Sequence, residues 1–232
     1  MLPVVILAGG LATRLQSLKK KLPKALIKIS GKPFIYHQLT YLRKEGVERV
    51  IICVGYLGDM IKNVVGNGEK FDIEVSYSED WPHLLGTGGA IKNALPLIRN
   101  KFFVLYGDTF LPINYKDIVK FHLKNKSKSV ITIIKNKGMW DKSNINFKND
   151  KIIEYNKFNN GPEMEYIDYG LSLLSKDIFN KYPPKKSFDL TVIFRQLIIQ
   201  KKLLGFEVYK RFYEIGSIEG LKQTNKYFKK KI

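Results

Sequence analysis

Short, almost purely apolar runs alternate with amphipathic segments along the first part of the chain. Residues 4–8 (VVILA), 49–56 (RVIICVGY) and 101–108 (KFFVLYGD) are rich in β-branched and aromatic residues, which is typical of strands buried on both faces of a parallel sheet. Residues 34–46 and 86–98 lie between them and have helical spacing. This alternation predicts an α/β fold with a doubly wound, mainly parallel, Rossmann-like sheet. The other elements expected in this part are helices over residues 59–65 and 117–126 and strands over residues 73–78 and 129–135.

The pattern changes near residue 136, where alternating apolar and polar positions replace the buried runs. Residues 143–157 alternate around a Lys-Asn-Asp-Lys turn, which predicts a hairpin with one solvated face. No linker-like segment separates the two parts, so we expect one domain over residues 1–232 whose halves meet near residue 136. The elements expected in the second half are strands over residues 166–174 and 203–216, a helix over residues 188–202 and a last helix that Ser217 caps.

The composition favours a globular protein without a membrane segment. Hydrophobic residues make up 44% of the 232 residues and aromatic residues 12%, which excludes a disordered chain. No apolar stretch reaches the roughly 18 residues of a membrane span, and the first residues lack the features of a signal peptide. We therefore expect a cytoplasmic protein. The single cysteine, Cys53, lies inside an apolar run, which favours a buried structural thiol over a disulfide or a catalytic thiol.

The charge is strongly basic, with a formal net value of +19. Such a charge can indicate nucleic-acid binding when the lysines are clustered. Here the lysines are spread from Lys19 to Lys231, which is typical of a compositional bias, so we expect no nucleic-acid partner.

The first apolar run ends at a glycine pair that is followed by basic residues. Gly9 and Gly10 fall at the carboxyl edge of the predicted sheet, where ligands bind and where glycine lets backbone N–H groups approach a phosphate. The spacing matches neither the dinucleotide fingerprint nor the P-loop. Arg14 and Lys24 could both neutralise a triphosphate, and a solvated basic loop is the alternative.

Two carboxylates stand at the ends of later strands. Asp108 closes the run FFVLYGD at the same sheet edge, and Glu214 ends an aromatic run before a glycine. Oxygen donors of this kind suit Mg²⁺, while a cap of the following turn is the alternative for Asp108. The sequence alone does not bring the two residues together.

Other candidate residues are weaker. The loop LLGTGGAI could lie flat against a planar ring, or it could be an ordinary glycine-rich turn. Lys157 lies in a predicted half-buried strand, where its ammonium group must meet an anion or reach solvent. No serine lies in a nucleophile elbow, and the three histidines, His37, His83 and His122, lack metal-ligand spacing, so hydrolase and zinc chemistry are disfavoured.

Six motifs follow one another along the chain: LAGGLATRL, PKALIKISGKP, LGTGGAI, YGD, EYNK and FYEIGS. Together they resemble the sugar-1-phosphate nucleotidyltransferase family, over residues 4 to about 221. Within that family the short chain is most similar to bacterial heptose-1-phosphate guanylyltransferases and compact uridylyltransferases. The resemblance implies transfer of NMP from a nucleoside triphosphate to a sugar 1-phosphate, with release of pyrophosphate, for surface polysaccharide synthesis. It is compatible with a homodimer.

The resemblance also assigns roles in the first half. Residues up to about 136 would form the nucleotide-binding half and residues 137–232 the acceptor-binding half. Arg14 and Lys24 would be catalytic, because they face the triphosphate and its α-phosphate. The residues that would bind the nucleotide are Leu7, Ala8, Gly9, Gly10, Thr13, Arg14, Gly86, Thr87 and Gly88.

Metal and acceptor roles follow from the same resemblance. Asp108 and Glu214 would share Mg²⁺, and Lys157 would bind the phosphate of the acceptor. Asp168 and Gly170 would lie beside the sugar.

Several positions depart from the family pattern. Ala12 stands where glycine is usual, and Glu214 replaces an aspartate. Asn156 and Asp168 also differ from the usual residues beside the sugar, which leaves the acceptor open. The longer loop EDWPHLLG leaves the base open as well. Two alternatives stand beside the main hypothesis: a cytidylyltransferase acting on a non-sugar phosphate such as phosphocholine, and a non-catalytic nucleotide-binding subunit.

Overall fold

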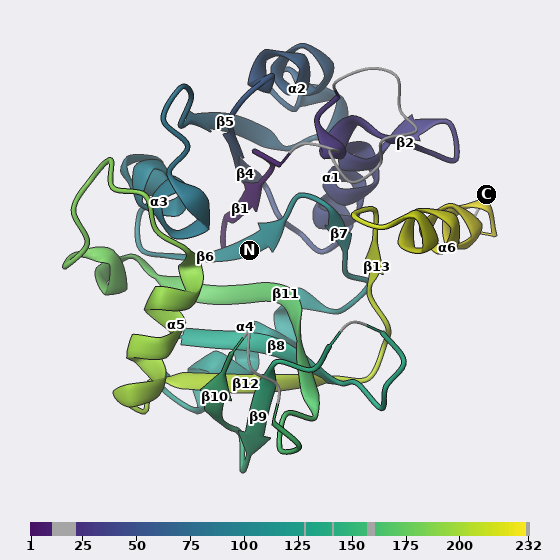
Figure 1. The fold of residues 1–232 in the computed structure, drawn as a ribbon. Helices are drawn as coiled ribbons and strands as arrows, with labels where there is room; N and C mark the ends of the chain where they lie inside the picture. The colour runs from purple at the N-terminus through teal and green to yellow at the C-terminus, as the bar shows by residue number, and fades with distance from the viewer. Residues whose placement is uncertain (11–21, 128, 141, 157–160, 231–232) are drawn as a thin grey trace.

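A computed structural model describes residues 1–10, 22–127, 129–140, 142–156 and 161–230 (Figure 1). Thr13, Arg14 and Lys157 lie outside the described residues. The described residues form a mixed sheet of nine strands in the order β5-β4-β1-β6-β11-β8-β12-β10-β9, with helices on both faces. This confirms the α/β prediction.

Four parallel strands make up the first part of the sheet. Apolar residues fill the central strands, and Val4, Val5 and Ile6 in the first strand are completely buried, whereas the edge strand β5 is mostly polar. Such runs suit strands that are covered on both faces. The strands, in spatial order, are β5 (Glu74–Glu79), β4 (Arg49–Val54), β1 (Val4–Leu7) and β6 (Lys101–Tyr106).

Helices cover the two faces of the sheet unequally. One face packs against α1 (Phe34–Lys44), α2 (Gly58–Val65) and α4 (Tyr115–Lys124). The other face packs against α3 (Gly86–Ala94) and α5 (Leu190–Ile199), which lie side by side (Figure 1). Helices α1, α2 and α4 lie within two residues of the ranges that the apolar spacing predicts. Helix α3 ends four residues before the predicted end, where a 3₁₀ turn (Leu95–Leu97) follows, and α5 ends three residues before it.

The second part of the sheet is mixed. Its long strand β11 (Tyr166–Ser175) runs antiparallel to β6 and to β8 (Ser129–Lys135), and β12 (Leu203–Val208) runs parallel to β8. The predicted hairpin is confirmed as β9 (Ile145–Lys148) and β10 (Lys151–Tyr155). Its turn residues have φ angles of 50° and 59°, the left-handed values that a tight two-residue turn requires.

The prediction of one strand over residues 203–216 is wrong. The run divides into β12 and β13 (Tyr213–Glu214), because the exposed Tyr209 and Lys210 lie outside the sheet. Strand β13 pairs instead with β7 (Thr109–Phe110) in a separate two-stranded ribbon. A second small ribbon joins β2 (Lys28–Ile29) and β3 (Lys32–Pro33).

The last helix, α6 (Ile218–Lys229), begins where the sequence predicts. The side chain of Ser217 accepts a hydrogen bond from the N–H of Gly220, which confirms it as the cap. Among the described residues, no helix combines the length and the apolar character that crossing a membrane requires.

Candidate active site

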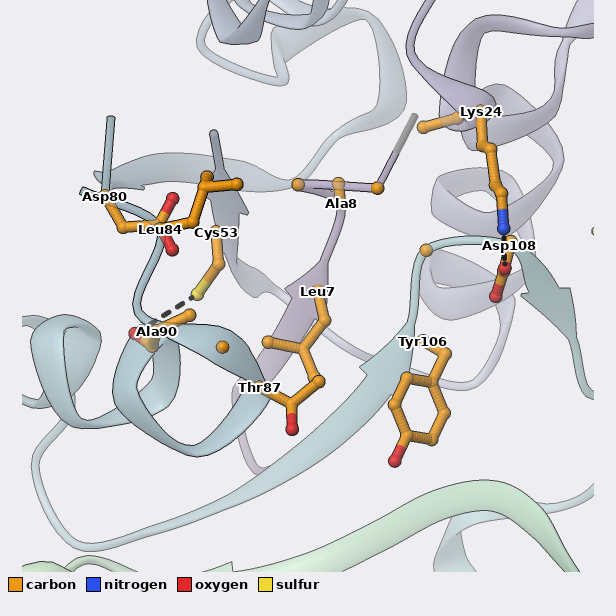
Figure 2. Close-up of a pocket in the computed structure, with 15 residues that line it drawn as sticks. Leu7, Ala8, Lys24, Cys53, Asp80, Leu84, Thr87, Ala90, Tyr106 and Asp108 are labelled. Carbon is orange, nitrogen blue, oxygen red and sulfur yellow. Dashed lines mark hydrogen bonds and ion pairs between the residues drawn. The ribbon is translucent and has the colours of Figure 1, made fainter. Parts of the chain in front are cut away.

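The carboxyl ends of the parallel strands enclose a cavity of about 290 Å³ (Figure 2). It lies where the glycine pair, the glycine-rich loop and the end of β6 converge, at the sheet edge that binds ligands in open α/β folds. Eight of the residues predicted to form the site line it: Leu7, Ala8, Gly9, Gly10, Lys24, Gly86, Thr87 and Asp108.

One end of the cavity carries an ion pair. Lys24 belongs to a short 3₁₀ turn (Lys24–Leu26), and its Nζ donates to Oδ2 of Asp108 at 3.0 Å. The backbone N–H of Lys24 donates to the carbonyl of Gly10 at 3.3 Å. The side chain of Lys24 is only 20% exposed, so it is not part of a solvated loop.

The β7–β13 ribbon brings the two predicted metal ligands together. The N–H of Ile215 donates to the backbone carbonyl of Asp108 at 3.0 Å. A Cβ atom at Gly216 would lie 3.1 Å from Oε2 of Glu214, 3.5 Å from Oδ2 of Asp108 and 3.6 Å from Nζ of Lys24. Both carboxylates and the lysine therefore converge on one point at the edge of the cavity.

Glu214 is at the same time bound to the start of α6. Its carboxylate accepts hydrogen bonds from the N–H of Gly216, from the hydroxyl of Ser217 and, at 3.0 Å, from the N–H of Ser217. No cluster of three or more metal-ligating side chains occurs within the described part of the chain. Mg²⁺ needs few protein carboxylates when phosphate oxygens complete its shell, so the donor set of Asp108 and Glu214 fits this ion.

The opposite end of the cavity holds Asp80, which our sequence analysis missed. Its Oδ2 accepts the N–H of Leu85 at 3.1 Å, and its Oδ1 lies 3.1 Å from the point where a Cβ at Gly55 would stand. Figure 2 shows Asp80 beside Leu84 and Cys53, far from the Lys24–Asp108 pair. Its position directly after β5, at the carboxyl edge of the sheet, is the signal that could have identified it.

Cys53 also lines the cavity, at the end of β4. Burial, together with the smaller effect of the nearby Asp80 charge, raises the pKa of its thiol to about 12. The prediction of a buried structural thiol is confirmed. A neutral thiol of this kind is a weak nucleophile.

The glycine-rich loop packs against a later segment of the chain. A Cβ atom at Gly88 would overlap the ring of Phe188, and one at Gly86 would lie 2.8 Å from the carbonyl oxygen of Phe188. The N–H groups of Gly88 and Gly89 donate to that carbonyl at 3.0 and 3.3 Å. Gly86 and Thr87 line the cavity, whereas Gly88 faces Phe188 and is not among the described residues that line it.

The predicted acceptor residues lie on β11, beyond Tyr106. Asp168 accepts hydrogen bonds from the Tyr155 hydroxyl and from the N–H of Gly170, both at 2.9 Å. A Cβ at Gly170 would lie 3.4 Å from the ring of Tyr106, which forms part of the cavity wall. Burial raises the pKa of Tyr106 well above its usual value, and the nearby carboxylates of Asp168 and Asp189 raise it further. Tyr106 therefore stays a protonated hydrogen-bond donor.

Comparison with known proteins identifies the family of the chain. A family model described as "Nucleotidyl transferase" matches residues 3–225. The chain therefore belongs to the nucleotidyl transferase family, and the prediction of a sugar-1-phosphate nucleotidyltransferase is confirmed.

Individual members of the family show how similar the chain is to proteins of known name. The chain is 37% identical over 186 residues to a D-glycero-α-D-manno-heptose 1-phosphate guanylyltransferase of Campylobacter jejuni, which covers 79% of this chain and 80% of the relative. It is 29% identical over 226 residues to the enzyme of the same name from Aneurinibacillus thermoaerophilus, with 96% of each chain covered. The crystal structure of HddC from Yersinia pseudotuberculosis superposes with a TM-score of 0.81 at 32% identity, over 98% of this chain and 100% of HddC. HddC has also been solved in complex with GMP-PN.

Proposed function

We propose that the protein transfers GMP from GTP to a heptose 1-phosphate, releasing pyrophosphate and forming a GDP-activated sugar for surface polysaccharide synthesis in the cytoplasm. One domain would carry the reaction, with a nucleotide-binding half up to about residue 136 and an acceptor-binding half over residues 137–232. The observation that carries the proposal is the arrangement of charge in the cavity, which has the Asp80 carboxylate at one end and the Lys24–Asp108 ion pair at the other (Figure 2). The names of the similar proteins support the base and the sugar.

Asp80 supplies the reason for guanine. A carboxylate only accepts hydrogen bonds, and guanine presents two adjacent donors, N1–H and the N2 amino group, that one carboxylate can bind together. Uracil and thymine place carbonyl oxygens on both sides of their single N–H donor, which a carboxylate would repel. A guanine at the Asp80 end would direct its triphosphate toward Lys24, at the other end of the cavity.

The chemistry needs positioned charge more than a general base. The phosphate of the acceptor is largely dianionic at neutral pH, because its second pKa is near 6. One of its oxygens attacks the α-phosphorus of GTP; the new P–O bond forms as the bond to the β-phosphate oxygen breaks, and the electron pair leaves with pyrophosphate. We assign Lys24 and Arg14 to the charge on the triphosphate and Lys157 to the phosphate of the acceptor.

Asp108 and Glu214 are the residues that would hold Mg²⁺, which would neutralise charge on the phosphates. The ion pair between Lys24 and Asp108 places a mobile cation at the same point. Tyr106, kept protonated by burial, is suited to donate a hydrogen bond toward the acceptor half.

The proposal is tested by measuring pyrophosphate release from each common nucleoside triphosphate with a set of sugar 1-phosphates and with phosphocholine. We expect release only with GTP, Mg²⁺ and a heptose 1-phosphate together. Steady release of inorganic phosphate from GTP alone would instead indicate a hydrolase. Turnover of CTP with phosphocholine would favour the cytidylyltransferase alternative, and no turnover with any pair would favour the non-catalytic one.

Replacement of Asp80 tests the base assignment separately. Asp80→Asn keeps one acceptor oxygen but puts an amide donor where guanine also donates, so kcat/KM for GTP should fall about tenfold or more, as expected for a lost charged hydrogen bond. Values for UTP and ATP should fall less. Glu79→Gln is the matched control, because Glu79 is the neighbouring carboxylate and pairs with Lys62 at the surface. An equal loss for all triphosphates would remove Asp80 from base selection.

A further inference from the structure

Two segments about a hundred residues apart are joined beside the cavity. One comprises residues 85–89, at the start of α3, and the other comprises residues 186–190, at the start of α5. The N–H of Phe188 donates to the carbonyl of Leu85 at 2.9 Å, and the carbonyl of Phe188 accepts from Gly88 at 3.0 Å. The glycines of the LGTGG sequence admit this contact, because side chains there would collide with Phe188 and Lys186.

The hydroxyl of Thr87 completes the junction. It donates to Oδ2 of Asp189 at 3.2 Å and accepts the N–H of Leu190 at 2.7 Å. The other oxygen of Asp189 caps α5 by accepting the N–H of Thr191 at 2.8 Å. One side chain in the wall of the nucleotide cavity thus fixes the first turn of α5.

From α5 the contacts continue to the acceptor half. Phe194 packs edge-to-face on the ring of Tyr155, with 5.7 Å between centroids. The Tyr155 hydroxyl donates to Asp168, a residue predicted to lie beside the sugar, at 2.9 Å. The negative charges of Asp168 and Asp189 both contribute to raising the pKa of Tyr106 and of Tyr155. The junction therefore lies between the cavity assigned to the nucleotide and the residues assigned to the acceptor.

We propose that Thr87 is a positioning residue that sets the acceptor half relative to the nucleotide cavity. The inference rests on the proposed function, since it concerns how the acceptor is presented to the α-phosphorus. In-line transfer is sensitive to small displacements of either reactant, so a loosened α5 lowers the rate and weakens acceptor binding. Lys24, which we assign to the triphosphate, lies apart from Thr87 in the wall of the cavity (Figure 2).

Thr87→Val tests the proposal, because it keeps the shape of the side chain and removes both hydrogen bonds. We expect the KM of the acceptor to rise about tenfold and kcat to fall, while the Kd of GTP changes less than threefold. Thr87→Ser should restore both values, because it keeps the hydroxyl. Thr191→Val is the matched control on the first turn of α5, and its KM values should equal those of the wild type. Melting temperatures show whether each variant is folded.

A matching rise in the Kd of GTP and the KM of the acceptor would overturn the inference, since Thr87 would then merely line the nucleotide cavity. Wild-type kinetics in Thr87→Val would overturn it as well. Hydrogen exchange provides a readout without an acceptor: with GTP bound, amides of residues 188–194 and 151–155 should exchange faster in Thr87→Val. Unchanged exchange there would refute the inference. A wild-type protein that uses no sugar phosphate would refute the proposed function alone, and the exchange measurement would still decide the role of Thr87.

Discussion

Lys24 shows how one residue acquires a role through its surroundings. Its motif leaves two interpretations open, a phosphate ligand and a solvated basic loop. The structure places its ammonium 3.0 Å from Asp108 in the wall of a cavity, with 20% of the side chain exposed. A lysine ammonium group is a mobile point charge, so Lys24 can contact a phosphate oxygen as well as the carboxylate of Asp108.

Replacing Lys24 by alanine should therefore remove stabilisation that matters most in the transition state. We expect kcat for pyrophosphate release to fall by two or more orders of magnitude, which corresponds to about 3 kcal/mol. The exposed Lys28, on β2, provides a matched control, and Lys28→Ala should retain wild-type turnover. Wild-type turnover in Lys24→Ala would return this residue to the solvated-loop interpretation.

At the scale of elements, the β7–β13 ribbon brings the two carboxylates of the candidate metal site together. Its two strands are two residues long, and they place Glu214 opposite Thr109, next to Asp108. The same carboxylate accepts hydrogen bonds at the start of α6, where a negative charge is favourable. Glu214 thus has a structural role in the described chain in addition to the metal role that we assign to it.

Glu214→Gln separates these roles, because it keeps the volume and removes the charge. We expect a higher Mg²⁺ requirement, lower turnover and a loss of stability of about 0.5 kcal/mol from the helix terminus. Glu219→Gln is the matched control, since Glu219 is in the first turn of α6 and hydrogen-bonds Gln223. That variant should lose similar stability and keep its Mg²⁺ dependence. Glu214→Asp should be the mildest change, because it keeps the charge.

The outcome that contradicts the metal assignment is full turnover of Glu214→Gln at low Mg²⁺. Asp108 and the phosphates would then hold the ion alone, and Glu214 would serve only α6. Titration of pyrophosphate release against Mg²⁺ distinguishes these cases, and urea unfolding measures the stability term.

Local patterns predicted most elements, because buried strands and amphipathic helices each have a characteristic spacing of apolar residues over a short stretch of sequence. The hairpin of β9 and β10 and the Ser217 cap were predictable for the same reason. The β7–β13 ribbon was not, because two-residue strands have no periodicity. The packing of Gly88 on Phe188 joins positions a hundred residues apart. The glycine-rich loop alone therefore did not show that Gly88 contacts another part of the chain.

The same distinction holds for the site. Residues inside motifs, such as Lys24 and Asp108, could be predicted because each motif has a recognisable composition. The position of Asp80 after β5 indicates the sheet edge, but its place opposite Lys24 in one cavity comes from how distant segments of the chain assemble. The position of Asp168 behind Tyr106 likewise depends on how β11 pairs with β6.

At the scale of the whole molecule, most of the positive charge lies at the surface, but some ionisable side chains are buried. The net charge of +19 is carried mainly by lysines along the surface, whereas two histidines are partly or fully enclosed. His122, on α4, is 2% exposed, and its Nε2 lies 2.8 Å from Nζ of Lys101. The ammonium group can donate to this nitrogen only while the imidazole is neutral, because a protonated ring has no acceptor.

This arrangement predicts a pH dependence of folding. Burial lowers the pKa of His122 and the charge of Lys101 lowers it further, while the unfolded chain keeps a value near 6.5. The unfolded state therefore binds more protons as the pH falls below 6.5, so the stability associated with neutral His122 is present above that value. This stability is lost as the pH falls from 6.5 through the lower pKa that His122 has in the folded protein.

Urea unfolding at several pH values between 8 and 5, in the wild type and in His122→Gln, isolates this contribution. Glutamine can accept a hydrogen bond from Lys101 but does not titrate, so the variant should lose less free energy of unfolding between pH 8 and pH 5. The pKa of His37 is also lowered, mainly by burial, but this residue is present in both proteins and cancels in the difference. The carboxylates cancel in the same way. Parallel pH profiles in the two proteins would show that His122 accepts a proton in the folded state as readily as in the unfolded chain.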